Sequence, residues 1–129
     1  MATSPLSVAR HCYRAYVDKD REAIEALIAK DYHFTSPIDN ALDRDSYFTN
    51  CWPNSAMITG FDPIYEVEDG NRVFVVYEGH AKDGKTFRNC EVHTVRDGML
   101  VETEVYFGWN LPHKVPWGRH IENEGEGHA

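Results

Sequence analysis

Apolar side chains recur at helical spacing near the start of the chain, and this pattern predicts two amphipathic helices. The first would span residues 5–18, with a proline in its first turn, where a missing N–H costs nothing. The second would be capped by Asp20 and end near residue 30. The two should form a helical hairpin.

A third helix and two strands are expected before residue 70. Residues 32–35 predict a short strand, and residues 38–42 predict a loop. Asp43 can cap the third helix, which would end at Pro53 because proline does not continue a helix. Residues 57–68 predict a long irregular strand that a turn closes.

Residues 72–109 then predict three strands joined by the turns Asp83-Gly84 and Asp97-Gly98, a strong hairpin signal. If both are two-residue turns, strict alternation sorts the side chains onto two faces. The mostly apolar face should cover a core and includes Tyr77, Val92, Thr103, Val105 and Phe107. The mixed face carries Phe74, Val76, Glu91, His93, Leu100, Glu102, Glu104 and Tyr106. A β-bulge would reverse part of this assignment.

The composition fits one compact α+β domain in a chain of 129 residues. The net charge of −8 argues against nucleic acid and anionic membranes as partners. Three cysteines without paired spacing indicate reduced thiols, and no apolar stretch suggests a signal peptide or membrane span, so a cytoplasmic protein is expected. The composition changes after Trp109, which predicts a domain over 1–112 followed by a C-terminal arm and flexible tail over 113–129.

Four segments carry a family resemblance: YRAYVDKDREAIEAL, FTSPIDN, DGKTF and VRDGMLVETEVYFGW. With the order of the elements, they resemble the nuclear transport factor 2-like superfamily, in its SnoaL-like and ketosteroid-isomerase-like branch. The resemblance implies a cone-shaped, cystatin-like α+β barrel, in which a curved antiparallel sheet wraps three N-terminal helices around a pocket. It also implies a homodimer formed through the convex sheet surface.

The catalytic residues of ketosteroid isomerase transfer only in part. The resemblance places Tyr13 at the tyrosine that polarises the substrate oxygen, and it places Ser36 where the isomerase has its base. The second aspartate falls on Val92 or His93, according to which glycine aligns the strands. Asp39, three residues beyond Ser36, is the candidate for a displaced base.

These observations favour a pocket for a small apolar or cyclic organic ligand with a carbonyl or hydroxyl group, without cofactor or metal. An enzyme would be an isomerase, cyclase or dehydratase that transfers a proton, with Tyr13 and Asp39 as catalytic residues. The expected pocket residues are Trp52, Tyr77, Val92, Thr103, Val105 and Phe107. The expected dimer-interface residues are Phe74, Val76, Glu91, His93, Glu102, Glu104 and Tyr106.

Two alternatives remain open. The domain could bind a ligand or assemble as a dimer without catalysis, which the two missing aspartates favour. The cluster of Glu91, His93, Glu102 and Glu104 could also form a metal or proton-transfer site rather than a solvated or interface cluster.

Overall fold

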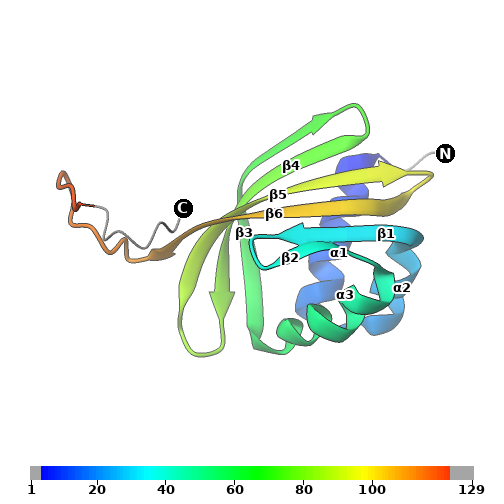
Figure 1. Cartoon of the computed structure of the whole chain (residues 1–129), viewed down its shortest axis with the longest axis horizontal. Helices are drawn as coiled ribbons and strands as arrows, with labels where there is room; N and C mark the ends of the chain where they lie inside the picture. Colours follow the sequence, from blue (N-terminus) through cyan, green and yellow to red (C-terminus); the bar gives the residue numbers. More distant parts are fainter. Residues whose placement is uncertain (1–3, 123–129) are drawn as a thin grey trace.

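A computed structural model describes residues 4–122 and contains three α-helices, one 3-10 helix and six strands (Figure 1). In chain order they are α1 (Pro5–Asp18), α2 (Arg21–Leu27), β1 (Ile28–Ser36), β2 (Asp39–Leu42), α3 (Arg44–Asn50), η1 (Trp52–Met57), β3 (Ile58–Asp69), β4 (Arg72–Ala81), β5 (Thr86–Arg96) and β6 (Met99–Leu111).

Side-chain caps set the start of all three α-helices. The oxygens of Ser4, Asp20 and Asp43 accept hydrogen bonds from backbone N–H groups three residues further along, which satisfies donors that have no partner inside the helix. The three predicted starts are therefore confirmed, because each one depended on a local capping signal.

Three boundaries differ from the prediction. The second helix ends at Leu27 because Ile28 is extended and opens β1, where it pairs with Leu100 and is buried. The expected loop at 38–42 contains the short strand β2, which pairs with β1. Pro53 lies inside η1, since it occupies the first turn of that helix, and α3 ends earlier at Asn50.

The strands form one strongly curved sheet in the order β2-β1-β6-β5-β4-β3. The pair β1–β6 is parallel and every other pair is antiparallel, so the sheet is mixed rather than fully antiparallel. Within the described residues its two edge strands do not pair, and the expected barrel remains an open cone. The predicted α+β class, with three helices against a curved sheet, is confirmed.

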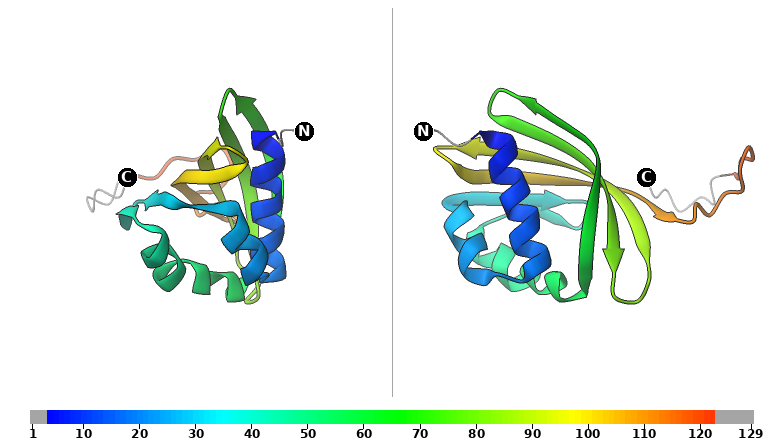
Figure 2. Two further views of the ribbon diagram at one scale, coloured as in Figure 1. Left: turned by 90° about the vertical axis from the view of Figure 1, so that its right-hand side faces the viewer. Right: turned by 180° about the vertical axis from the view of Figure 1, so that it is seen from behind.

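Helix α1 lies across the concave face of the sheet (Figure 2). On one side of the interior, Ala9 of α1 packs with Val73, Val75 and Tyr77 of β4. On the other side, α2, α3 and β1 enclose a second apolar cluster around Ile24, Ile28, Tyr32, Tyr47, Phe48 and Leu100. A cavity lies between the two clusters.

The segment after β6 projects away from the body of the molecule (Figure 1). Residues 112–122 contain neither helix nor strand, and the Trp117 side chain is fully exposed. The division into a domain over 1–112 and an arm and flexible tail over 113–129 stays a prediction, and residues 123–129 lie outside the described residues. Among the helices described, none has the length and apolarity needed to span a membrane.

Candidate functional site

The loop between β4 and β5 has one residue more than predicted, and this reverses the faces of β5. The Gly84 N–H donates to the Ala81 carbonyl at 3.0 Å, and the Ala81 N–H donates to the Lys85 carbonyl at 2.9 Å. The loop therefore consists of residues 82–84, with Gly84 at φ +86°, and Gly79 pairs with Phe87. The expected two-residue turn at Asp83-Gly84 is therefore wrong.

A bulge near the C-terminal end of β5 shifts its pairing with β6 by one residue. The two-residue turn at Asp97-Gly98 forms as predicted, with Arg96 opposite Met99, but the register then shifts by one residue. His93 consequently lies opposite Thr103, and Glu91 lies opposite Val105. The carboxylate of Glu91 and the imidazole of His93 therefore both point into the cone.

The predicted surface quartet is therefore divided. Glu91 and His93 were expected on the outer face and lie inside, where the His93 side chain is 2% exposed and that of Glu91 is 13% exposed. Glu102 and Glu104 belong to the opposite face. Val92, expected in the pocket, also lies on that outer face, where it pairs with Phe74.

A cavity of about 250 Å³ opens between α1, α3 and the concave sheet. Six predicted site residues line it: Tyr13, Asp39, Tyr77, Thr103, Val105 and Phe107. Trp52 is not among the lining residues and instead packs edge-on to Tyr16, with ring centroids 5.6 Å apart. Ile38 lines the cavity and is 80% exposed, so it marks the mouth.

A hydrogen-bonded carboxylate forms the polar wall of this cavity. Tyr13 donates its hydroxyl to Glu91 Oε1 at 3.0 Å, and Tyr77 donates to Glu91 Oε2 at 2.7 Å. His93 Nε2 lies 2.8 Å from the Tyr13 oxygen and 3.2 Å from Glu91 Oε1. If His93 Nε2 carries a proton, it donates to Tyr13, which in turn donates to Glu91.

The network continues into the neighbouring strands. His93 Nδ1 lies 3.0 Å from Thr103 Oγ1, and Asn89 Nδ2 donates to the Tyr77 oxygen at 3.2 Å. Asn89 Oδ1 accepts the Gly108 N–H at 3.2 Å. Within the described part of the chain, every buried side-chain nitrogen and oxygen has a hydrogen-bond partner. The network therefore fixes the position of each polar group in the wall.

These contacts keep Glu91 ionised. Burial raises its pKa, but hydrogen bonds from His93, Tyr77 and Tyr13 and the positive charge of His93 outweigh burial, so its pKa is lowered. Burial, followed by the charge of Glu91, raises the pKa of Tyr13 well above its ordinary value. Tyr13 therefore keeps its proton and remains a hydrogen-bond donor.

Asp39 reaches the same cavity from β2. Its Oδ2 accepts the Ser36 hydroxyl at 2.7 Å, so Ser36 holds the neighbouring carboxylate. Burial, followed by the charge of Asp39, raises the pKa of Cys51 to about 11. Asp39 and Cys51 thus share one part of the cavity wall.

Several lining residues were missed by the sequence analysis, among them Phe61, Phe87 and Asn89. Glu91 and His93 were assigned together to one face of the sheet, but to the wrong one. The available signal was the segment from Lys82 to Lys85, because Gly in the third position also suits a three-residue hairpin loop.

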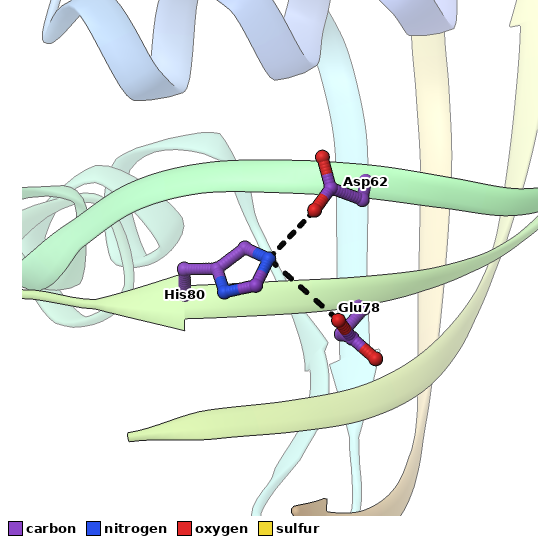
Figure 3. A group of neighbouring side chains, drawn as sticks. All are labelled: Asp62, Glu78 and His80. Atoms are coloured by element: carbon purple, nitrogen blue, oxygen red, sulfur yellow. Dashed lines mark hydrogen bonds and ion pairs between the residues drawn. The ribbon is translucent and has the colours of Figure 1, made fainter. Parts of the chain in front are cut away.

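A second group of titratable side chains lies on the outer face of the sheet, away from the cavity (Figure 3). His80 Nε2 is 2.7 Å from Asp62 Oδ2 and 3.8 Å from Glu78 Oε2, and the three ligand atoms lie close enough to hold a metal ion. Arg88 approaches Glu78 Oε1 at 3.4 Å and offsets part of the negative charge. Hydrogen bonds and ion pairs among side chains at the surface account for this arrangement.

Comparison with known protein families identifies a family for most of this chain. The sequence profile of the SnoaL-like domain matches residues 9–103, which is most of the chain. The chain belongs to the SnoaL-like domain family. A search among curated proteins finds no significant match.

Solved structures share the SnoaL-like fold at low sequence identity. A protein from Kribbella flavida is 18% identical with a TM-score of 0.73, over 80% of this chain and 85% of its own. A LEH-like epoxide hydrolase of M. tuberculosis is 17% identical with a TM-score of 0.67, over 83% and 84%. IdmH, a candidate polyketide cyclase from Streptomyces antibioticus, is 21% identical with a TM-score of 0.63, over 80% and 91%. This SnoaL-like domain therefore shares its fold with these proteins, and in this chain the fold encloses the cavity between α1, α3 and the sheet.

Proposed function

We propose that this SnoaL-like domain binds a small cyclic organic molecule in its cavity and transfers a proton beside a carbonyl group, as an isomerase, cyclase or dehydratase does. The observation that carries the proposal is the buried Glu91 carboxylate, joined to two phenols and an imidazole on the wall of a largely aromatic cavity. Converging polar groups in an apolar pocket are typical of a catalytic or binding site.

Tyr13 is the group that would polarise the ligand oxygen. It keeps its proton and lines the cavity, and its hydroxyl oxygen lies 2.8 Å from His93 Nε2. Its hydroxyl can turn from Glu91 to a ligand carbonyl, while Tyr77 and His93 continue to hold Glu91. A donor already positioned in a dry site stabilises the charge that develops on an enolate oxygen.

Glu91 is better suited to positioning than to accepting the proton. Both of its oxygens already accept hydrogen bonds, and its lowered pKa makes it a weak base. Its role in the proposal is to hold Tyr77 in place throughout and Tyr13 until that hydroxyl turns to the ligand.

Asp39 is the proposed proton acceptor. It lines the cavity from another strand, and its described hydrogen bond uses Oδ2, which leaves Oδ1 to take the proton. Asp39 would remove a proton from the carbon next to the carbonyl, and the enolate would form with its oxygen at Tyr13. Return of that proton to another carbon of the ligand completes an isomerisation, and the step balances without further reactants.

We also propose a homodimer that forms through the outer face of the sheet. Apolar side chains lie in register there across β3, β4, β5 and β6, and the set comprises Tyr65, Val67, Phe74, Val76, Cys90, Val92 and Tyr106. Tyr65 is 67% exposed and Tyr106 is 54% exposed. Glu102 and Glu104 border this face, whereas the cavity residues Glu91 and His93 do not belong to it.

The catalytic proposal can be tested by hydrogen exchange in D2O. The purified protein would be incubated with neutral cyclic ketones, beginning with 2-tetralone, and deuterium uptake next to the carbonyl would be followed by NMR. The wild-type protein should accelerate exchange over buffer, and Tyr13→Phe should lower the rate roughly 100-fold or more, as for loss of an oxyanion donor. Asp39→Asn should lower it at least as far, because the proposed base is lost.

Asp62→Asn is the matched control, because it removes an aspartate on the outer face and should leave the rate unchanged. Ligand binding without accelerated exchange in the wild-type protein would overturn catalysis and favour a non-catalytic binding domain. Equal loss in the Asp62 variant would show that the effect does not arise in the cavity.

A further inference from the structure

The charge and the aromatic lining of the cavity define a class of ligand. We infer that the cavity selects organic cations, with a small ring-bearing protonated amine as the preferred ligand, and rejects carboxylates and phosphates. The inference rests on the proposed function in that the same cavity is the binding site. The substrate of the proposed reaction would then carry both a carbonyl group and a protonated nitrogen.

The formal charge of the cavity is negative in either state of its imidazole. Of the 21 described lining residues, two are acidic, Asp39 and Glu91, and none is a lysine or arginine. His93 is paired with Glu91 at 3.2 Å, so a protonated imidazole neutralises one carboxylate and leaves the other. The sum is −1 with a charged His93 and −2 with a neutral one. An anionic ligand would meet repulsion without a compensating cation.

Two thiols in the lining respond to the same negative field. The pKa of Cys12 is raised to about 12, by burial first and by the charge of Glu91 second. The pKa of Cys51 is raised to about 11 by burial and by the charge of Asp39. A thiolate is an anion placed at the cavity wall, and both carboxylates oppose its formation. The charge of the carboxylates favours an ammonium group at these positions, whereas burial, the larger cause of both shifts, penalises either sign of charge.

The uncharged part of the lining also favours a cation. Nine of the 21 lining residues are aromatic. Tyr13, Phe61 and Tyr77 pack with ring centroids between 4.9 and 5.7 Å apart, which fixes a rigid aromatic corner beside Glu91. The faces of aromatic rings attract cations, and cages of such rings are used for ammonium ligands. The net charge of −8 also draws cations toward the molecule.

Three nearly isosteric probes separate the effect of charge from that of shape: benzylamine, benzyl alcohol and benzoate. Their dissociation constants would be measured by calorimetry at pH 7 in low salt. Benzylamine should bind at least tenfold more tightly than benzyl alcohol, and benzoate at least tenfold more weakly. Glu91→Gln and Asp39→Asn should each reduce the preference for benzylamine over benzyl alcohol severalfold, since both substitutions remove charge and keep size.

Glu104→Gln is the control, because it removes a carboxylate from the outer face and should leave all three constants unchanged. Equal or tighter binding of benzyl alcohol would overturn the charge selectivity and leave the proposed function standing. An equal loss of benzylamine binding in the Glu104 variant would also overturn it, because the amine would then bind at the surface. Absence of binding for all three probes would overturn the cation selectivity, whereas the exchange of 2-tetralone in D2O decides the proposed catalysis separately.

Discussion

Glu91 shows how a carboxylate can be retained inside an apolar cone. Desolvation opposes its charge, and the protein compensates with hydrogen bonds from Tyr13 and Tyr77 and with the imidazole of His93. These partners come from α1, β4 and β5, so one side chain connects three elements. Such a group stabilises the fold only while its partners are present and it remains ionised.

The stability of the protein should therefore depend on pH through Glu91. Because the folded-state pKa is below the unfolded value, which is roughly 4.3, the stabilisation is complete above that value and is lost as the pH falls through the folded pKa. Glu91→Gln should lower the free energy of unfolding by about 1–3 kcal/mol at pH 7, as for a buried group that loses part of its partners. The difference from wild type should shrink below about pH 4.

Urea unfolding followed by tryptophan fluorescence between pH 3 and 7 measures this difference. Glu102→Gln, on the outer face, is the matched control and should give a curve parallel to wild type. A constant difference between Glu91→Gln and wild type at every pH would contradict the assignment of the effect to ionisation.

At the scale of elements, the turn between β4 and β5 determines which side chains reach the cavity. A two-residue turn at Asp83-Gly84 would point Val92 inward and Glu91 outward, whereas the observed three-residue loop does the reverse. The side-chain period of a strand is two residues, so one extra loop residue reverses a whole strand. The polar wall thus depends on the length of a distant loop.

This dependence explains what the sequence could and could not predict. The helix starts were predictable because Ser4, Asp20 and Asp43 cap them locally. Tyr13 and Asp39, the two candidate catalytic residues, both line the cavity, and their catalytic roles stay a prediction. The inward position of Glu91 was missed, because residues 82–84 suit a three-residue loop as well as a two-residue turn and because the bulge in β5 is set by its pairing with β6. The alternation of apolar and polar residues alone assigns a carboxylate to the solvent-facing side of a sheet, even when it is buried.

The other turn of the ribbon should be sensitive to loss of glycine. Asp97 and Gly98 have φ values of +54° and +77°, the left-handed conformation that a type I′ turn requires. Gly98→Ala should therefore lower the free energy of unfolding by about 1–2 kcal/mol, the cost of a Cβ in this conformation. Gly60→Ala is the control: its φ is not positive and its added Cβ would meet open space, so its effect should stay within about 0.5 kcal/mol. Chemical unfolding compares the two, and equal effects would contradict this account.

At the scale of the whole molecule, the two faces of the sheet present different side chains. The concave face lines the cavity, and the convex face carries the apolar side chains that lie in register across β3 to β6. Large exposed apolar patches on soluble domains mark interaction surfaces. The Asp62, Glu78 and His80 group borders the same face, which gives the proposed interface a polar rim (Figure 3).

A charge in the middle of the convex face should therefore dissociate the proposed dimer. Val76 lies between Tyr65 on β3 and Cys90 on β5, and Val76→Asp would bury an unpaired carboxylate from each copy at the interface. The dissociation constant should rise roughly 100-fold or more, about 3 kcal/mol.

Met57→Asp places the same charge on an exposed apolar residue outside this face, and it should leave the dimer intact. Sedimentation velocity over a concentration series measures both variants, and circular dichroism verifies that they are folded. A wild-type monomer at every concentration, or equal dissociation in both variants, would contradict the convex face as the interface. A selective effect of Val76→Asp would place contact between copies opposite the cavity, so that each copy keeps its own cavity mouth open to ligand.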